Sequence, residues 1–447
     1  MKNNNQIRVR FAPSPTGHGH IGGLRTALFN WLFAKHHGGK FLLRIEDTDL
    51  ERSRTEYTDS ILEAFKWAGI ESDEPLVIQT QRFELYKQKL QNLLDTGAAY
   101  RSDPAKEENG KSVIRFRVPR DEKVIAFDDL IHGRIEFPVD QIDDFVIARA
   151  DDSPLYNFVV VVDDVDMHIS HIIRADEHIP NTPRQLLLYK ALGATPPQFA
   201  HVSLILGASG KPLSKRDAAT SVLEYRTEGY LPDALCNYLV RLGWSHGDQE
   251  LFSREELIKV FTLEGINKSG AMFDPKKLLW VNSEYLRKTT AQDLIKYIVD
   301  WVEPAFVEQC NSWDNQKLQL AVDLYKERVA TLKELATIIM RLHNAPTYEK
   351  LPDGFAWSAQ TVELLQELIV RSADLSDATA SGIKKLFESI CADRNVALPM
   401  LAKPVRFALT GVMESPSVFS LVELLGVEET TDRLQKLQTF IEQKITK

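Results

Sequence analysis

A run of two prolines and a glycine at positions 13–17 separates a short strand-like segment from a helix-like one. Residues 7–11 alternate apolar and polar side chains, which is typical of a strand, and the prolines then force a turn. Residues 41–45 predict a second strand. The order strand, loop, helix, strand predicts the opening unit of a nucleotide-binding α/β fold. The helix between the strands is predicted over residues 22–37, with four apolar side chains on one inward face: Leu24, Leu28, Trp31 and Leu32.

Charged and glycine residues lie where such a unit binds ligands. Arg10 ends the first strand, and the acidic run 46–49 follows the second. Gly22 and Gly23 leave backbone N–H groups open at the helix start, which suits a phosphate, and His20 adds a side-chain donor. The alternative is a plain Gly-Gly turn with a satisfied histidine. For Arg10, the alternative is an ion pair with Asp47 or Asp49 that braces the two strands.

Three spaced strings carry a specific resemblance. Residues 13–17 (PSPTG), 20–23 (HIGG) and 44–49 (RIEDTD) closely resemble the glutamyl-tRNA synthetases of bacteria. The string HIGG corresponds to the HIGH signature of class I aminoacyl-tRNA synthetases, with Gly23 in place of the last histidine. His18 lies outside the signature and is assigned no function.

Composition sets outer limits on the chain. Its 447 residues predict three to five domains, and 44% hydrophobic with 26% charged residues is ordinary for a globular protein. No apolar run is long enough to cross a bilayer, so we expect a cytoplasmic protein with no membrane association. Although the net charge is −9, residues 1–54 hold nine Lys and Arg against four Asp and Glu, which leaves RNA binding open. Three widely spaced cysteines are expected as reduced core thiols: Cys236, Cys310 and Cys391.

Residues 99–150 differ in texture from the segments on either side. Four short strands are predicted there, over residues 113–118, 125–130, 134–137 and 145–149. The resemblance implies that this insertion binds the tRNA acceptor stem. Many relatives carry a Cys-x-Cys pair and further zinc ligands here, whereas this chain runs Arg-Ser-Asp-Pro over residues 101–104. His132 alone cannot form a four-ligand site, so zinc is not expected.

The second half of the fold is predicted from about residue 151. A buried strand is expected over 169–173, a helix over 185–192 and a strand over 198–206. Arg174 and Glu177 follow the first of these strands. They match a ligand-binding string of the family, and the alternative is a surface ion pair.

A basic loop follows at residues 207–216, where Lys211, Lys215 and Arg216 can stabilise phosphate charge. An isolated loop of this kind reads as a solvated surface, but its last five residues resemble the KMSKS signature. Pro212 replaces the first signature lysine, so Lys215 is the one carried over.

The predicted fold class is α/β: a Rossmann-type parallel sheet core, an inserted α+β acceptor-binding domain and an all-helical anticodon-binding region. The predicted domains are residues 1–98 (catalytic, first half), 99–150 (insertion), 151–243 (catalytic, second half), 244–328 (stem contact) and 329–447 (anticodon binding).

The resemblance implies a glutamate–tRNA ligase that works as a monomer with ATP, Mg²⁺, L-glutamate and tRNA-Glu, and leaves tRNA-Gln open as a second substrate. Such enzymes usually require bound tRNA before they activate glutamate. The implied catalytic residues are His20 and Lys215. The implied ligand contacts are Pro13, Thr16, His20, Gly22, Gly23, Glu177, Lys215 and Arg216 for ATP, Arg10, Ser14, Glu46, Tyr156 and Arg174 for glutamate, and Asp49, Lys403 and Arg406 for tRNA.

Four alternatives have less support. A small-molecule nucleotidyltransferase would leave the helical C-terminal third without a task. The truncated paralogue that glutamylates a modified tRNA base lacks an anticodon-binding domain, and glutaminyl-tRNA synthetases usually end in β-barrels. A non-catalytic RNA-binding paralogue would not need the signature residues His20, Glu46, Arg174 and Lys215.

Overall fold

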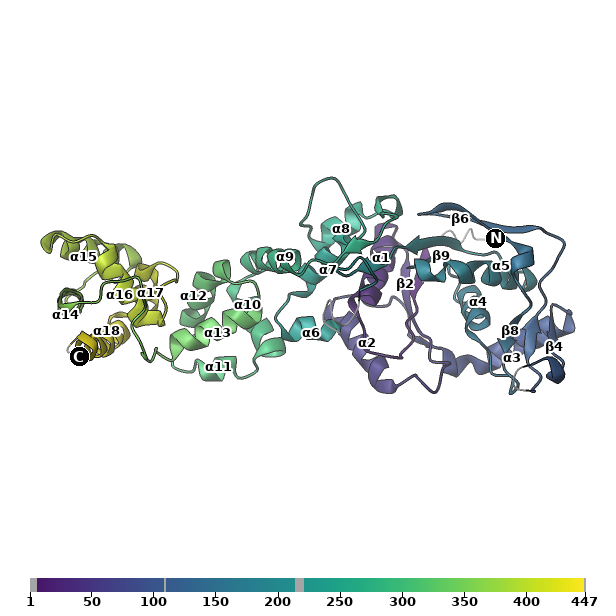
Figure 1. Cartoon of the computed structure of the whole chain (residues 1–447), viewed down its shortest axis with the longest axis horizontal. Coiled ribbons are helices and arrows are strands. Elements are labelled where there is room, and N and C mark those ends of the chain that lie inside the picture. The colour runs from purple at the N-terminus through teal and green to yellow at the C-terminus, as the bar shows by residue number, and fades with distance from the viewer. Residues whose placement is uncertain (1–5, 108–109, 214–220, 446–447) are drawn as a thin grey trace. The chain divides into compact units, whose positions relative to one another are not determined.

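The computed structural model describes residues 6–107, 110–213 and 221–445. The chain forms two compact units: residues 1–226 with 231–281, and residues 227–230 with 282–447. Every strand of the described residues lies in the first unit, and the second unit is helical (Figure 1). The predicted fold class is confirmed.

Three parallel strands form the first sheet, in the order β1-β2-β3. β1 (Arg8–Phe11) pairs with β2 (Lys40–Ile45), and β2 pairs with β3 (Val77–Ile78). α1 (Ile21–His36) connects the first two strands and α2 (Thr55–Trp67) the next two. β1, α1 and β2 are the elements that the opening sequence pattern predicts.

A second sheet, of order β7-β6-β10-β9, adjoins the first at β1. β9 (His171–Ala175) and β10 (Gln198–Val202) are parallel and are connected by α5 (Thr182–Ala191). The backbone N–H of Ser170, just before β9, donates to the carbonyl oxygen of Arg8 at 2.9 Å. The strand order therefore reverses between β1 and β9, which is the switch point where open α/β sheets bind ligands.

α1 is buried on all sides rather than on the single face that its apolar spacing predicted. Every residue from Leu24 to Ala34 is buried. β1, β2 and β9 pack against the helix, and α7 (Pro232–Arg241) and α8 (Arg254–Val260) cover it as well. Because tertiary packing encloses the whole helix, its N-terminus at the ligand site is held by the core.

The inserted segment follows α3 (Phe83–Asp95) and contributes to two sheets. β4, β5 and β8 form an antiparallel sheet, whereas the β6–β7 hairpin extends the core sheet, with β6 parallel to β10 at the pair Asp129 and Phe199. All four strands predicted in the segment are confirmed. The bounds are β4 (Ala99–Arg101), β5 (Ile114–Phe116), β6 (Val124–Asp129), β7 (Gly133–Pro138) and β8 (Phe145–Ala148).

The apolar residues near the start of the second half of the fold form a helix, α4 (Tyr156–Asp166), that is buried from Phe158 to Asp164. It lies against α5 and carries two consecutive acidic residues at its buried end. The other elements of the first unit are β11 (Ile205–Leu206), α6 (Val222–Thr227), β12 (Ala271–Met272) and α9 (Pro275–Lys288), which ends in the second unit.

The second unit confirms the helical C-terminal region predicted after residue 330. Arg433 ties it together, because its buried guanidinium donates from Nη1 to the carbonyl oxygen of Leu409 at 2.7 Å and from Nη2 to that of His343 at 3.3 Å. The helices are α10 (Ala291–Tyr297), α11 (Phe306–Gln309), α12 (Asn315–Tyr325), α13 (Leu332–His343), α14 (Ala359–Ser372), α15 (Ala380–Asp393), α16 (Pro399–Thr410), α17 (Val418–Leu425) and α18 (Val427–Ile445).

The three cysteines are free and buried, as predicted for core thiols. Among the described residues, no helix is both long enough and apolar enough to span a membrane.

Candidate active site

The Pro/Gly loop after β1 is held against the end of β2. The backbone N–H of Glu46 donates to the carbonyl oxygen of Pro13 at 3.0 Å, and that of Arg54 donates to Pro15 at 3.1 Å. Ser14, between the two anchored prolines, and Thr16, directly after them, are both exposed. The loop residues predicted to contact ATP and glutamate thus lie on a fixed, open edge of the sheet.

His20 caps the N-terminus of α1. Its Nδ1 accepts a hydrogen bond from the backbone N–H of Gly23 at 3.1 Å, so this nitrogen carries no proton and Nε2 is left as a donor. A Cβ atom on Gly22 would lie 3.1 Å from Nδ1, and the glycine therefore leaves room for the ring. Desolvation lowers the pKa of His20 and the charge of Glu177 opposes it, which favours a neutral imidazole at pH 7.

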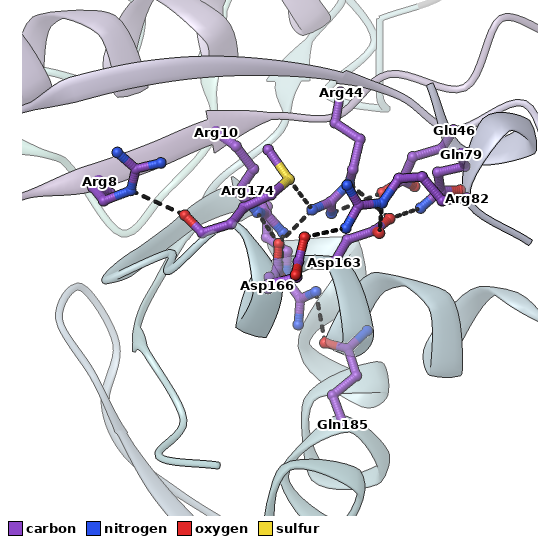
Figure 2. Close-up of polar contacts among 12 residues, drawn as sticks. Arg8, Arg10, Arg44, Glu46, Gln79, Arg82, Asp163, Asp166, Arg174 and Gln185 are labelled. Carbon is purple, nitrogen blue, oxygen red and sulfur yellow. Dashed lines mark hydrogen bonds and ion pairs between the residues drawn. The ribbon is translucent and has the colours of Figure 1, made fainter. Parts of the chain in front are cut away.

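Two arginines from neighbouring strands meet the acidic end of α4 (Figure 2). Arg10 on β1 holds Asp164 through Nε at 3.0 Å and Nη2 at 3.3 Å, and Nη1 of Arg44 on β2 lies 2.6 Å from the same carboxylate. Asp164 is buried, and desolvation raises its pKa. Arg10 and Arg44 outweigh that effect, so the pKa is lower than that of an ordinary aspartate and the group is ionised.

Glu46 faces the same side of β2 as Arg44, because side chains two residues apart in a strand share a face. Nη2 of Arg44 donates to Oε1 of Glu46 at 3.1 Å. Glu46 is buried, and desolvation raises its pKa against the charges of Arg44 and Arg10. A buried carboxylate at a strand end is suited to a cationic ligand group.

The neighbouring Asp163 fixes the outer side of this network. It accepts from Gln79 and Arg82 at 2.8 Å each and from the hydroxyl of Tyr86 at 3.0 Å. Arg82 also pairs with Asp166 at 2.5 Å. α4 is thereby tied to α3 and to the turn after β3, which keeps Asp164 in place beneath Arg10.

Arg174, at the end of β9, is buried among neutral groups. It donates from Nε to His201 at 3.1 Å, from Nη1 to Gln185 at 2.8 Å and from Nη2 to Thr182 at 2.8 Å (Figure 2 shows the Gln185 contact). No ion pair of the described residues includes this guanidinium. Desolvation lowers its pKa. A buried cation with neutral partners is suited to an anionic ligand.

The surface ion pair between Arg174 and Glu177 that the sequence left open is not formed. Glu177 is exposed and lies 3.9 Å from the Nε2 of His178. The hydroxyl of Tyr156, at the start of α4, lies 3.2 Å from the Nδ1 of His178, and burial raises the pKa of Tyr156 to about 12. Tyr156 is therefore a neutral hydrogen-bonding group beside Glu46.

Arg10 has a different partner from the two that the sequence suggested. It pairs with Asp164, whereas Asp47 accepts from Thr80 at 2.6 Å and Asp49 from Arg52 at 2.7 Å. The Asp47 or Asp49 alternative is wrong, because Asp47 turns toward Thr80 in the segment after β3 and Asp49 turns toward Arg52 in the segment after β2.

The remaining predicted residues lie elsewhere or outside the described residues. Lys215 and Arg216 belong to the residues that the structure does not describe, and Lys211 is exposed. Lys403 and Arg406 are on α16 in the second unit, where Lys403 is exposed and Arg406 donates from Nε to Ser415 at 2.9 Å.

Sequence reasoning missed Arg44, Asp163 and Asp164 as parts of the site. One signal was present, because two aspartates end a run of buried valines and a buried carboxylate requires a cationic partner. The neighbouring sequence could not reveal which cation is the partner, because Arg44 and Asp164 are 120 positions apart. Within the described ranges, no cluster of three or more His, Cys, Asp or Glu side chains could hold a metal ion.

The family comparison agrees with this fold. A family model described as "tRNA synthetases class I (E and Q), catalytic domain" matches residues 6–109 and 102–280, and a model described as "Anticodon binding domain" matches residues 293–438. The first unit is therefore the catalytic domain of a class I aminoacyl-tRNA synthetase.

Full-length relatives narrow the family further. A glutamate–tRNA ligase of Thermodesulfovibrio yellowstonii is 44% identical over 96% of this chain and 99% of that protein, and one of Pelobacter propionicus is 41% identical over 98% and 99%. The crystal structure of a glutamate tRNA ligase from Elizabethkingia meningosepticum in complex with its amino acid has a TM-score of 0.87, with 32% identity over 98% of this chain and 100% of that one. The chain belongs to the glutamate–tRNA ligase family.

Proposed function

We propose that this protein ligates L-glutamate to the 3′ end of tRNA-Glu, with ATP, through a glutamyl-adenylate intermediate. The observation that carries the proposal is the buried Arg174 at the switch point of the sheet, which forms no ion pair within the described residues, together with the buried carboxylate of Glu46 at the end of β2. Glutamate carries two carboxylates and one ammonium group, which such a site complements. Use of the product in translation supports a cytoplasmic location.

Each amino-acid contact has a chemical reason. Glu46 would hold the substrate ammonium. Arg174 would hold a carboxylate, because its guanidinium forms no ion pair with any carboxylate of the described part of the chain. Arg10 has Nε and Nη2 engaged by Asp164, which leaves Nη1 for the ligand. Ser14 and Tyr156 add hydroxyl groups at the open edge.

ATP would bind at the N-terminus of α1. The open backbone N–H groups there and the Nε2 donor of His20 suit phosphate oxygens. The other proposed ATP contacts are Pro13, Thr16, Gly22, Gly23, Glu177, Lys215 and Arg216. Mg²⁺ would bind together with ATP and neutralise the charge of its phosphates, because this ion is usually held by substrate phosphates and water.

The reaction proceeds in two steps. The α-carboxylate of glutamate attacks the α-phosphorus of ATP, the bond to the β-phosphate oxygen breaks, and pyrophosphate leaves. A ribose hydroxyl of the terminal adenosine, the 2′-OH by class I analogy, then attacks the activated carbonyl and AMP leaves. The protein contributes positioning and stabilisation of developing negative charge. Asp49, Lys403 and Arg406 are the proposed tRNA contacts.

Charging of purified tRNA-Glu and tRNA-Gln, side by side, tests the function. We expect glutamate to be esterified to tRNA-Glu, and charging of tRNA-Gln in the same assay would define a non-discriminating enzyme. ATP–pyrophosphate exchange is expected with glutamate and tRNA together. If pyrophosphate exchange occurs with neither tRNA-Glu nor tRNA-Gln, the result would favour a non-catalytic paralogue and would overturn the proposal.

Lys215 and Lys211 offer a matched pair in the signature loop. If Lys215 stabilises the activation transition state, Lys215→Ala should slow adenylate formation by on the order of 100-fold or more. Lys211→Ala, one position before the signature, should cost less. Equal losses in pyrophosphate exchange would contradict the assignment of the signature to Lys215.

The inserted segment is proposed to function without zinc. Elemental analysis of the purified protein should find no stoichiometric zinc. Treatment with a chelator should leave charging activity intact once Mg²⁺ is restored. One zinc per chain would show that the segment has been misinterpreted.

A further inference from the structure

Two buried hydrogen bonds connect Arg174, through His201, to Asp129 in the inserted segment. Nε of Arg174 donates to Nε2 of His201 at 3.1 Å, and Nδ1 of His201 lies 2.6 Å from Oδ2 of Asp129. Arg174 is the second-last residue of β9, His201 lies on β10, and Asp129 is the last residue of β6. Arg174 is 6% exposed, Asp129 3% and His201 0%, so water does not compete for these hydrogen bonds.

The contacts define the tautomer of His201. Its Nε2 accepts a hydrogen bond from Nε of Arg174, and its Nδ1 faces the carboxylate of Asp129. The proton of the neutral imidazole is therefore on Nδ1. Asp129 also accepts from the backbone N–H groups of Ile131 and His132 at 2.9 Å each and from that of His201 at 3.1 Å. Desolvation raises the pKa of Asp129, but the hydrogen bonds from the side chain of His201 and from the backbone N–H groups of His132 and Ile131 outweigh it and hold this pKa below its ordinary value. Desolvation lowers the pKa of His201. The pair is therefore a carboxylate beside a neutral imidazole.

We propose that Asp129 and His201 are positioning residues that orient Arg174 for the glutamate carboxylate. The inference rests on the proposed function, because it assumes that Arg174 binds glutamate. A guanidinium without a carboxylate partner can rotate about its side-chain torsions, and three neutral acceptors hold it in one plane. Asp129 sets the tautomer that makes His201 one of those acceptors.

The hydrogen-bonded series Asp129–His201–Arg174, called the relay below, also joins two parts of the first unit. Gln185 and Thr182 come from α5 of the catalytic core, whereas Asp129 comes from the segment inserted between the two halves of that core. A change in the β6–β7 hairpin has a direct path of two hydrogen bonds to Arg174. Amino-acid recognition thus depends on a residue of the insertion that is not among the proposed substrate contacts.

Two substitutions at His201 separate its two hydrogen bonds. Asparagine places an N–H near the position of Nδ1, which keeps the bond to Asp129 and removes the acceptor for Arg174. Glutamine places an oxygen near the position of Nε2, which keeps the acceptor and loses the donor to Asp129. In pyrophosphate exchange with tRNA present, we expect His201→Asn to raise the KM for glutamate by about tenfold or more, because a buried donor is left unsatisfied. The KM for ATP should stay within about twofold. His201→Gln should recover most of the loss.

Asp129→Asn gives an independent arm. Loss of the charge lets His201 carry its proton on Nε2, which faces Arg174, so the KM for glutamate should rise by several-fold. Glu136→Gln is the control on the same hairpin, since Glu136 is exposed and pairs with Arg134 at 3.3 Å. Denaturant unfolding of each variant measures any loss of stability separately.

The outcomes distinguish the relay from the function itself. Equal rises in the KM for glutamate and for ATP, or no advantage of His201→Gln over His201→Asn, would overturn the relay. If His201→Asn does not fold, the Asp129→Asn and Glu136→Gln comparison decides, and equal KM values for glutamate in these two variants would overturn it. An unaltered protein without glutamate-dependent exchange would instead overturn the proposed function.

Discussion

The buried arginines in the two halves of the catalytic sheet have different kinds of partner. On the β1–β2 side, Arg10 and Arg44 contact the carboxylate of Asp164 directly, at 3.0 and 2.6 Å. On the β9–β10 side, Arg174 contacts neutral groups, and the hydrogen bonds that lead from it to the carboxylate of Asp129 pass through His201. The two arginines that pair with Asp164 are part of the scaffold, whereas Arg174, whose partners are neutral, is the arginine that we propose for the substrate carboxylate.

The pKa directions agree with this difference. The carboxylates around Arg44 raise its pKa in spite of desolvation, so its charge is stabilised by the fold itself. Desolvation lowers the pKa of Arg174 because no carboxylate offsets it to the same extent. Binding of an anion would supply the missing partner, and the free energy of that pairing is available to substrate recognition.

The largest expected effect is on stability, at Asp164. Asp164→Asn leaves two buried guanidiniums without their common anion, and breaking a buried ion pair from one side costs about 3–5 kcal/mol. Urea unfolding of the first unit should show this loss. Asp166→Asn is the matched control on the same helix, where Asp166 is half exposed and pairs with Arg82, and it should cost about 1 kcal/mol or less. Equal stabilities would remove the scaffold interpretation.

The next effect is on substrate affinity, at Arg174. Arg174→Gln removes the uncompensated charge but abandons no carboxylate, so the protein should lose much less stability than Asp164→Asn does. The KM for glutamate should rise on the order of 100-fold, because a charge-assisted contact to the carboxylate is lost. The KM for ATP should change little. A stable variant with an unchanged KM for glutamate would show that Arg174 does not bind the substrate.

The smallest effect concerns the choice between glutamate and glutamine, at Arg10. A guanidinium offers only donors, which match carboxylate oxygens and leave an amide NH₂ of glutamine unpaired. Arg10→Leu should raise the KM for glutamate by about tenfold and reduce the glutamate-to-glutamine ratio of kcat/KM. Because Arg10 also pairs with Asp164, Arg10→Lys serves as a companion that keeps the charge without the forked geometry. If Arg10→Leu lowers the stability of the protein but leaves the glutamate-to-glutamine ratio of kcat/KM unchanged, Arg10 only braces the fold and does not select the substrate.

The sequence alone determined the local architecture of the site. The Pro/Gly run, the helix start at His20 to Gly23 and the acidic end of the second strand are short-range patterns, and each is in the predicted place. Turn residues, helix caps and strand alternation act over a few positions, so they can be read without the fold. The same strings carry the family resemblance that the comparisons confirm.

Only the tertiary structure decided which charges meet. Arg10 and Asp164 are 154 positions apart, and Asp129 and His201 are 72 apart, so no local pattern relates them. The complete burial of α1 has the same origin, because helices that come more than 200 residues later cover its outer side. Burial removes water as a partner and makes the choice of partner decisive, and burial is a property of the assembled core rather than of any segment.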